Sequence, residues 1–365
     1  MKLIRRTIAR LAATVVSQTW IIRLAPRAAQ FWVPKILPHN SDPAVFRVWV
    51  QLATSGLPEA QFQIARSYLQ GTSVPQSYDE ALKWFHRAAT QGHSEAKVSV
   101  ALLAIQGFVA PDGSASYRGK GGAIFSCRGS CKDRTPRFDV SLVWARLAAF
   151  DGVIEGQALL GYLLSFGPPS MRDLKVAREW LEKSAARGSP RGALALAMLL
   201  AGQDDGKSLA TKVLALLTLA SDKGLPLAAR LLAISAEHGL GRERNPKDAF
   251  CHYQRAADGG DPFSQIKIGL ALMMGIGTRA DPTTGETWLR RSALSGDPEA
   301  AFLLGELYLH GIHVLPDYIN AERWLEEAAQ LGHRGASRTL GIIRLTGLFG
   351  VRDVKCALES LSKPL

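Results

Sequence analysis

The sequence predicts an all-α protein, a right-handed α-solenoid of about seven to eight helix-turn-helix repeats. Three observations predict this fold: a glycine recurs every 36 residues, a small and an aliphatic residue recur at fixed distances after it, and a tryptophan recurs at one distance before it. Because a single helical hairpin cannot bury its apolar stripe alone, stacked hairpins must share a continuous core.

The recurring glycine closes each repeat. Successive glycines are 36 residues apart, except for one gap of 60, and they are Gly56, Gly92, Gly152, Gly188, Gly224, Gly260, Gly296 and Gly332. The expected repeats are therefore residues 57–92, 93–152, 153–188, 189–224, 225–260, 261–296, 297–332 and 333–365. With a half-repeat before the first of them, they form a predicted solenoid domain over residues 42–365.

The first helix of each repeat is marked by three positions after the preceding closing glycine. The fourth residue is Ala, Gly or Ser, and the eighth is Ile, Val or Leu, on the same helical face. The fifteenth residue is glycine in all repeats but one, which has Gln203. A glycine there predicts that the helix ends in a left-handed residue.

The second helix carries a tryptophan eight residues before the closing glycine in five repeats, and a pair of small residues follows. These tryptophans are Trp84, Trp144, Trp180, Trp288 and Trp324. Small residues let neighbouring helices approach closely, so we expect the tryptophan to be a core anchor beside a flat patch.

The second repeat contains 24 extra residues between its helices, in a predicted insertion over residues 108–139. Cys127 and Cys131 lie in it, and their spacing suits a local disulfide, half a metal site or an unpaired loop. No further cysteine or histidine lies close enough in sequence to complete four ligands, so we expect no metal and no cofactor. Cys251 and Cys356 are expected to pack within second helices.

Residues 298–311, followed by 320–324 and 327–332, resemble the Sel1-like repeat, a relative of the tetratricopeptide repeat with a longer loop between its helices. The resemblance covers residues 57–365. It implies a scaffold or adaptor that binds other proteins, and it does not identify the partner.

Two short patterns that are typical of enzymes fail in their context. Residues 201–208 loosely match a phosphate-binding loop, but they follow a helix and contain two aspartates where phosphate would lie. Residues 94–97 match a serine-lysine pattern of penicillin-recognising enzymes, but they open a repeat, where Ser94 is expected to cap the helix. We predict no catalytic residue and no enzyme. The alternative is an enzyme, or a metal- or cofactor-handling protein, that uses the Cys127/Cys131 insertion.

By analogy with tetratricopeptide packing, positions three, six, ten and thirteen of the first helices should face a concave groove. These positions are mostly apolar and predict a groove that receives a peptide or an amphipathic helix. The predicted partner-binding residues are Val98, Leu102, Ile105, Leu194, Met198, Phe263, Ile266, Leu270, Met273, Phe302, Glu306 and Leu309. If the phasing is wrong by one residue, these side chains belong to the core.

Residues 1–41 are a separate basic segment. They hold seven of the basic side chains that give the chain its net charge of +12 and no acidic one, and the rest of the chain has 37 basic and 32 acidic side chains. On a helix, Arg5, Arg6 and Arg10 lie away from an apolar stripe, which is typical of a helix on an anionic membrane, of a transit signal or of a capping helix.

The charge distribution also decides the expected partners and location. Because the excess of positive charge is concentrated in residues 1–41, we expect other proteins and an anionic membrane surface as partners, and no nucleic acid. The expected location is cytoplasmic and peripheral to a membrane, with an organelle or the periplasm as the alternative.

Overall fold

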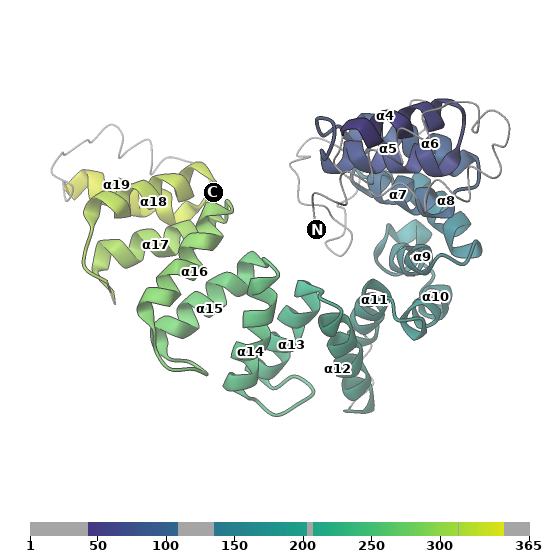
Figure 1. Cartoon of the computed structure of the whole chain (residues 1–365). Coiled ribbons are helices and arrows are strands. Elements are labelled where there is room, and N and C mark those ends of the chain that lie inside the picture. The colour runs from purple at the N-terminus through teal and green to yellow at the C-terminus, as the bar shows by residue number, and fades with distance from the viewer. Residues whose placement is uncertain (1–42, 109–134, 203–206, 313, 347–365) are drawn as a thin grey trace, which may run out of the picture. The chain divides into compact units, whose positions relative to one another are not determined.

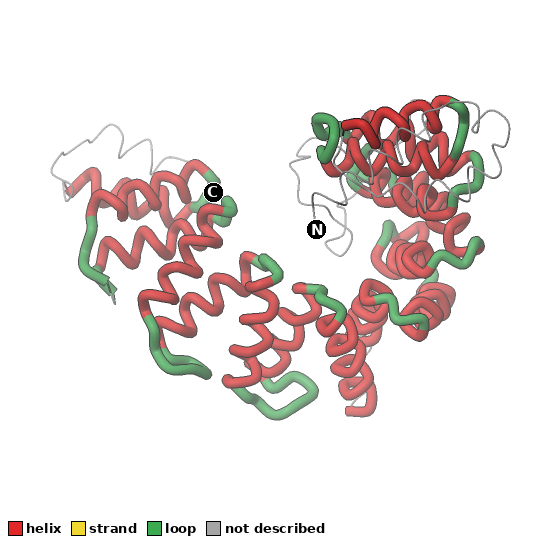
Figure 2. Tube along the Cα trace, in the orientation of Figure 1, coloured by secondary structure: helices red, strands yellow, loops and turns green. Residues whose placement is uncertain are grey.

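The computed structural model describes residues 43–108, 135–202, 207–312 and 314–346. Within these residues it contains sixteen α-helices, one short 3₁₀ helix and no strand (Figures 1 and 2). Helices that follow one another in sequence pack together over residues 43–186 and over residues 207–346, which confirms the predicted all-α fold of stacked hairpins. The basic segment 1–41 and the part of the last repeat after residue 346 lie outside the described residues.

The chain divides into two compact parts, residues 1–199 and 200–365, called here the N-terminal half and the C-terminal half. The helices of the N-terminal half are α4 (Pro43–Thr54), α5 (Pro58–Gln70), α6 (Tyr78–Thr90), α7 (Ser94–Ile105), α8 (Phe138–Phe150), α9 (Ile154–Phe166), η1 (Pro169–Met171) and α10 (Leu174–Ala186). The boundary falls within α11 (Pro190–Ala201). The helices of the C-terminal half are α12 (Lys207–Asp222), α13 (Pro226–His238), α14 (Pro246–Asp258), α15 (Pro262–Met274), α16 (Pro282–Leu294), α17 (Pro298–His310), α18 (Tyr318–Gln330) and α19 (Arg334–Thr346).

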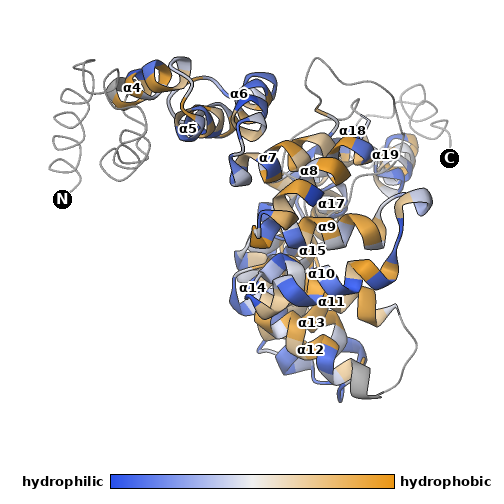
Figure 3. Ribbon diagram, turned by 90° about the vertical axis from the view of Figure 1, so that its right-hand side faces the viewer, coloured by the Kyte–Doolittle hydropathy of each residue, from blue (hydrophilic) through white to orange (hydrophobic). Residues whose placement is uncertain are grey.

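The core lies within each hairpin and between successive hairpins. In the N-terminal half, one cluster joins Phe62 of α5, Phe85 of α6 and Val100 of α7, and in the C-terminal half another extends from α15 to α19. Many helices are hydrophobic along one side and hydrophilic along another (Figure 3). Burial of the hydrophobic sides is the main favourable term that holds the hairpins together.

Each closing glycine has a left-handed backbone. The φ angles of the eight closing glycines lie between +80° and +97°. The Gly92 N–H donates to the Ala89 carbonyl at 3.0 Å and the His93 N–H donates to the Ala88 carbonyl at 3.1 Å, which is the hydrogen-bond pair of a Schellman motif. A Cβ at Gly92 would meet no atom within 4 Å, so the backbone conformation, and not a lack of space, requires glycine.

The small fourth residue of the repeats is buried in all eight cases. It faces the pair of small residues on the second helix before it. A Cβ added at Gly156 would lie 2.7 Å from Ala148 Cβ, and one added at Gly192 would lie 2.2 Å from Ser184 Oγ. The predicted close approach of neighbouring helices is therefore present.

The recurring tryptophans are half-buried, so the prediction that they anchor the core is wrong. The residue after the tryptophan has no exposed surface in any of the five repeats, where it is Phe85, Ala145, Leu181, Leu289 and Leu325. In α16, Leu289 packs over Gly269, where an added Cβ would lie 2.8 Å from Leu289 Cγ. Trp288 precedes Leu289 by one residue, so its side chain points about 100° away from that of Leu289 around the helix. It packs at the edge of a cluster, and the Arg291 guanidinium lies 5.2 Å from its ring centre.

Among the described residues, the fifteenth-position glycines follow the prediction with one exception. Gly71, Gly239, Gly275 and Gly311 end their helices in the left-handed conformation. Gly167 is instead extended, with φ −68° and ψ −174°. Pro168 follows it, and a residue before proline favours an extended backbone.

A recurring hydrogen bond closes the loop between the two helices of a repeat. The residue before the second helix donates its N–H to a carbonyl near the end of the first, as Ser77 does to Tyr68 at 3.0 Å. Arg137 makes the equivalent bond to the Ala104 carbonyl at 2.8 Å, although the insertion precedes it. The last two residues of the predicted 108–139 insertion belong to α8, which corrects that boundary.

Polar side chains also connect successive repeats. His93 Nδ1 accepts the Ala96 N–H at 3.2 Å, and His93 Nε2 lies 3.0 Å from Glu59 Oε2 in the repeat before it. His333 makes the equivalent contacts in the C-terminal half. One imidazole thus caps a first helix and ties it to the preceding repeat.

We predict that Leu289→Ala lowers the free energy of unfolding by about 2–5 kcal/mol, because it leaves a cavity at a fully buried site. Trp288→Ala should cost less, because the indole packs only at the edge of its cluster. Urea unfolding followed by circular dichroism measures both losses. A larger loss for Trp288→Ala would restore the tryptophan as the core anchor.

We also predict that the protein tolerates removal of residues 110–133. The deletion leaves five residues between Gly107 and Arg137, as between Gly71 and Ser77. The Arg137 hydrogen bond to Ala104 is kept, so helicity should persist and the melting temperature should change by less than about 3 °C. Loss of cooperative thermal unfolding would show that the insertion is structural.

Candidate functional site

The predicted groove residues lie on four first helices, α7, α11, α15 and α17. Five are buried: Val98, Ile105, Leu194, Ile266 and Met273. The other seven keep some exposure: Leu102, Met198, Phe263, Leu270, Phe302, Glu306 and Leu309. The expectation of a groove-facing surface is therefore wrong for the buried five, which pack inside the core. Arg5, Arg6 and Arg10 lie outside the described residues.

The exposed face of α15 follows a regular helical spacing. Phe263, Lys267, Leu270 and Met274 are separated by four, three and four residues and are partly or mostly exposed. They occupy positions three, seven, ten and fourteen of the repeat. Positions three and ten are among the four that were expected to face the groove, and their role in binding stays a prediction. On the same helix, Ile266 and Met273 turn into the core.

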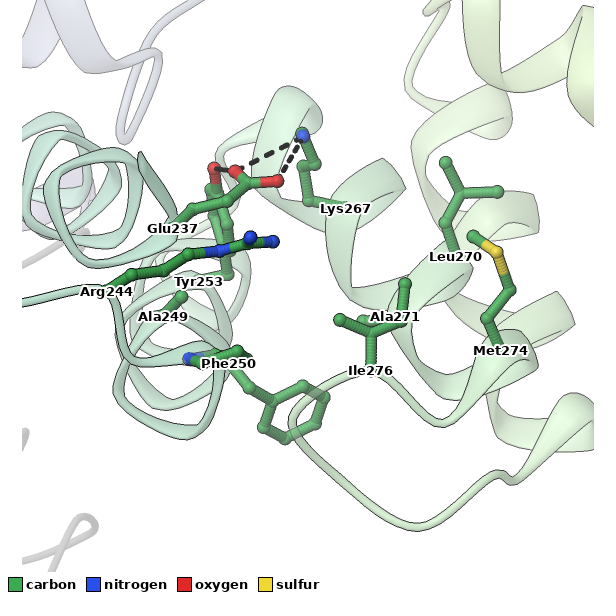
Figure 4. A pocket seen from close by; sticks show the side chains of 11 residues that line it. Glu237, Arg244, Ala249, Phe250, Tyr253, Lys267, Leu270, Ala271, Met274 and Ile276 are labelled. Atoms are coloured by element: carbon green, nitrogen blue, oxygen red, sulfur yellow. Dashed lines mark hydrogen bonds and ion pairs between the residues drawn. The ribbon is translucent and has the colours of Figure 1, made fainter. Parts of the chain in front are cut away.

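A pocket of about 260 Å³ opens beside this face in the C-terminal half (Figure 4). It is formed by α13, α14 and α15 and by the loops that follow α13 and α15. Its lining residues are Glu237, Arg244, Pro246, Ala249, Phe250, Tyr253, Lys267, Leu270, Ala271, Met274 and Ile276. Leu270 is the predicted groove residue among them.

One wall of the pocket is a network centred on the Glu237 carboxylate. Lys267 Nζ lies 2.9 Å from Glu237 Oε1, and the Tyr253 hydroxyl donates to Glu237 Oε2 at 2.5 Å. Burial acts to raise the pKa of Glu237, but the hydrogen bonds from Tyr253 and Lys267 outweigh it and hold the pKa below its ordinary value. Burial and the bond to Glu237 raise the pKa of Tyr253, which keeps its proton.

The other wall of the pocket is apolar. Figure 4 shows Phe250 on one side and Leu270, Ala271 and Met274 on the other, with Ile276 between them. Met274 is 58% exposed and Ile276 is 51% exposed. The pocket therefore combines a fixed polar network with apolar side chains that solvent reaches.

Sequence reasoning missed Arg244, Tyr253 and Lys267. A signal for Tyr253 is present, because it follows the position that tryptophan holds elsewhere, where five other repeats have a buried Phe or Leu and one has Ala145. A buried tyrosine needs a partner for its hydroxyl. The sequence does not show which residue supplies that partner, because Glu237 lies on a different helix.

The serine-lysine pattern does not form an active site. Ser94 Oγ donates to Asp151 Oδ2 at 2.9 Å, and Lys97 Nζ lies 2.5 Å from the same oxygen. Both side chains therefore bind a carboxylate of the adjoining loop. His93, and not Ser94, caps α7, which corrects the predicted cap.

The remaining candidates are the cysteines, a metal site and a membrane-spanning helix. Cys251 is an exposed free cysteine, which corrects its expected packing role. Within the described ranges, no group of three His, Cys, Asp or Glu side chains could hold a metal ion, and no helix is long and apolar enough to cross a membrane. Cys127, Cys131 and Cys356 lie outside those ranges, so the alternative that rests on the insertion stays a prediction.

Comparison with known proteins identifies the repeat. The Sel1 repeat family model matches residues 58–93, 154–189, 226–261, 262–297 and 298–333. The matched segments leave out the repeat with the insertion, the repeat that contains Gln203 and the last repeat, residues 333–365. No curated protein matches the sequence.

Solved structures of other repeat proteins resemble the chain, among them the following two. One is c5321, a protective antigen of uropathogenic Escherichia coli with an SLR fold, with a TM-score of 0.59 and 22% identity over 86% of this chain. The match covers 62% of the antigen's length. The other is a Sel1 repeat protein from Oxalobacter formigenes, with a TM-score of 0.55, 25% identity and coverage of 87% of this chain and 85% of that one. With the repeat spacing, the stacked hairpins and the family matches in agreement, the chain belongs to the Sel1-repeat family.

Proposed function

We propose that the protein is a non-enzymatic scaffold that binds a partner protein at the pocket and the exposed α15 face of its C-terminal half. The observation that carries the proposal is a pair of exposed apolar side chains that line the pocket, Met274 and Ile276. Position fourteen of the repeat is Gln70, Gln106, His238 and His310 in four other repeats and the exposed Phe166 in the third, whereas α15 has Met274, which is 58% exposed and lines the pocket. Exposed apolar side chains that gather beside a pocket are typical of interaction sites.

The class of protein and the size of the pocket support this proposal. Sel1-repeat proteins typically act in protein–protein interaction. Small-molecule pockets usually measure about 300–1,000 Å³. At about 260 Å³, this pocket is smaller and suits one or two side chains of a peptide or of an amphipathic helix.

We predict that Met274→Glu weakens capture of the partner about tenfold, because it places a charge at the apolar wall. Leu294→Glu is the matched control, because Leu294 is 75% exposed on α16 and does not line the pocket. Quantitative mass spectrometry of proteins captured by the full-length chain measures the effect. Both variants should keep the wild-type melting temperature. Equal capture by Met274→Glu and wild type would contradict the proposal.

We further propose, from the sequence, that residues 1–22 hold the protein at an anionic membrane surface on the cytoplasmic side. Lys2, Arg5, Arg6 and Arg10 fall within the first ten residues, and apolar residues recur on the opposite helical face. Each cation contributes about 1 kcal/mol near an anionic surface, and the apolar stripe adds insertion.

We predict that Arg5→Glu, Arg6→Glu and Arg10→Glu together abolish flotation with phosphatidylserine vesicles at low salt. Three attractive charges become repulsive in this variant, while the repeats are unchanged. Vesicles of phosphatidylcholine alone are the control and should bind neither protein. Equal flotation of the variant and the wild type would assign the segment to capping or targeting instead.

A further inference from the structure

We infer that the pocket accepts a partner segment in which an acidic side chain lies next to an aliphatic or aromatic one. The inference rests on the proposed function, because it names the chemistry of the partner that the same pocket would bind. It follows from the balance of charges around the pocket and from the position of its apolar wall.

The charges that line the pocket do not cancel. Glu237 is the one lining anion, and Lys267 and Arg244 are the two lining cations. Glu237 and Lys267 form an ion pair, with 2.9 Å between Oε1 and Nζ, and the lowered pKa of Glu237 keeps its carboxylate ionised. Among the described residues, no carboxylate lies within ion-pair distance of Arg244. The pocket therefore carries one uncompensated positive charge.

The position of Arg244 directs this charge toward the pocket. Arg244 belongs to the loop between α13 and α14, and in Figure 4 its side chain points toward α15. Glu243 precedes it in sequence but does not line the pocket and forms no ion pair with it. Arg242, two residues earlier, pairs with Asp248. Arg244 is thus the cation in this loop whose planar donor group is available to a carboxylate.

The apolar wall fixes the second feature of the partner. Phe250, Leu270, Ala271 and Met274 stand across from the polar network, and the space they border holds one or two side chains. An aliphatic or aromatic side chain that enters it removes apolar surface from water. A neighbouring Asp or Glu would then reach Arg244, whereas a basic neighbour would meet repulsion from it.

Phage display with a random peptide library on the full-length protein tests the inference. Selection on the wild type, with counter-selection on the Leu270→Glu variant, enriches peptides that need the pocket. We expect enriched peptides to carry Asp or Glu beside Leu, Ile, Met or Phe. Lysine in place of the acidic residue should weaken binding of a synthetic enriched peptide about tenfold at low salt, and less at high salt, by fluorescence anisotropy.

The variant Arg244→Glu should invert the charge preference, so that the lysine peptide binds better than the acidic one. Arg279→Glu is the matched control, because Arg279 is an exposed arginine of the next inter-helix loop that does not line the pocket. It should leave the preference unchanged. The same inversion in both variants would show that general surface charge decides binding, and would overturn the inference.

The outcomes separate this inference from the proposed function. Enriched peptides that need Leu270 but show no acidic preference would overturn the inference and leave peptide binding in place. Failure to enrich any peptide over the Leu270→Glu variant would overturn both. Enrichment of segments from this chain itself, with dimers in light scattering that Met274→Glu disrupts, would make a second copy the occupant and overturn a separate acidic partner.

Discussion

The left-handed glycine at the end of each repeat is the constraint on which the stacking depends. It turns the chain from a second helix into the next first helix and lets two successive amides bond back to the helix end. At Gly92 the accepting carbonyls belong to Ala88 and Ala89, the same small residues that the next first helix packs against. One short segment therefore ends a helix, sets the turn and presents the contact surface. A side chain at the glycine would strain the turn, and a larger residue in the pair would push the hairpins apart.

Because one short segment has these three roles, the fold could be predicted from the sequence. The left-handed turn requires glycine, and the close contact between helices requires small residues. Both requirements are local, so these residues recur at a fixed spacing in every repeat. The direction of the apolar side chains is not fixed in the same way. In α15, Ile266, Ile268, Leu270 and Leu272 are all apolar, because the helix packs against its own second helix and against the neighbouring hairpins. Periodicity is then weak, and a phase error of one residue moves a side chain by about 100° between core and surface. In α16 the same 100° separates the half-buried Trp288, which was expected to anchor the core, from the fully buried Leu289.

The pocket could not be predicted because its residues come from three helices and two loops. The Glu237–Lys267 pair joins residues 30 apart on successive first helices, and Tyr253 reaches the same carboxylate from the second helix between them. Their proximity follows from the stacking and not from any local pattern. The sequence does show that the repeat of residues 225–260 differs from the repeat pattern. His252 stands at the tryptophan position, and Tyr253 stands where most repeats have a buried Leu or Phe. A departure of this kind indicates an altered environment, but it does not identify the residue that completes it.

A second network in the C-terminal half shows what distinguishes the pocket. The Tyr308 hydroxyl donates to Glu286, and Arg290 Nη2 lies 2.5 Å from both Glu286 Oε1 and the Tyr308 oxygen. Tyrosine, glutamate and a cation therefore meet there as they do at Glu237, and the one positive and one negative charge are matched. Beside Glu237 the same kind of network is also matched, and Arg244 is added to it from the loop. The repeated architecture thus supplies a neutral polar link between neighbouring helices. In our proposal, preference for an acidic partner arises because Arg244, an extra side chain from an inter-helix loop, joins that link.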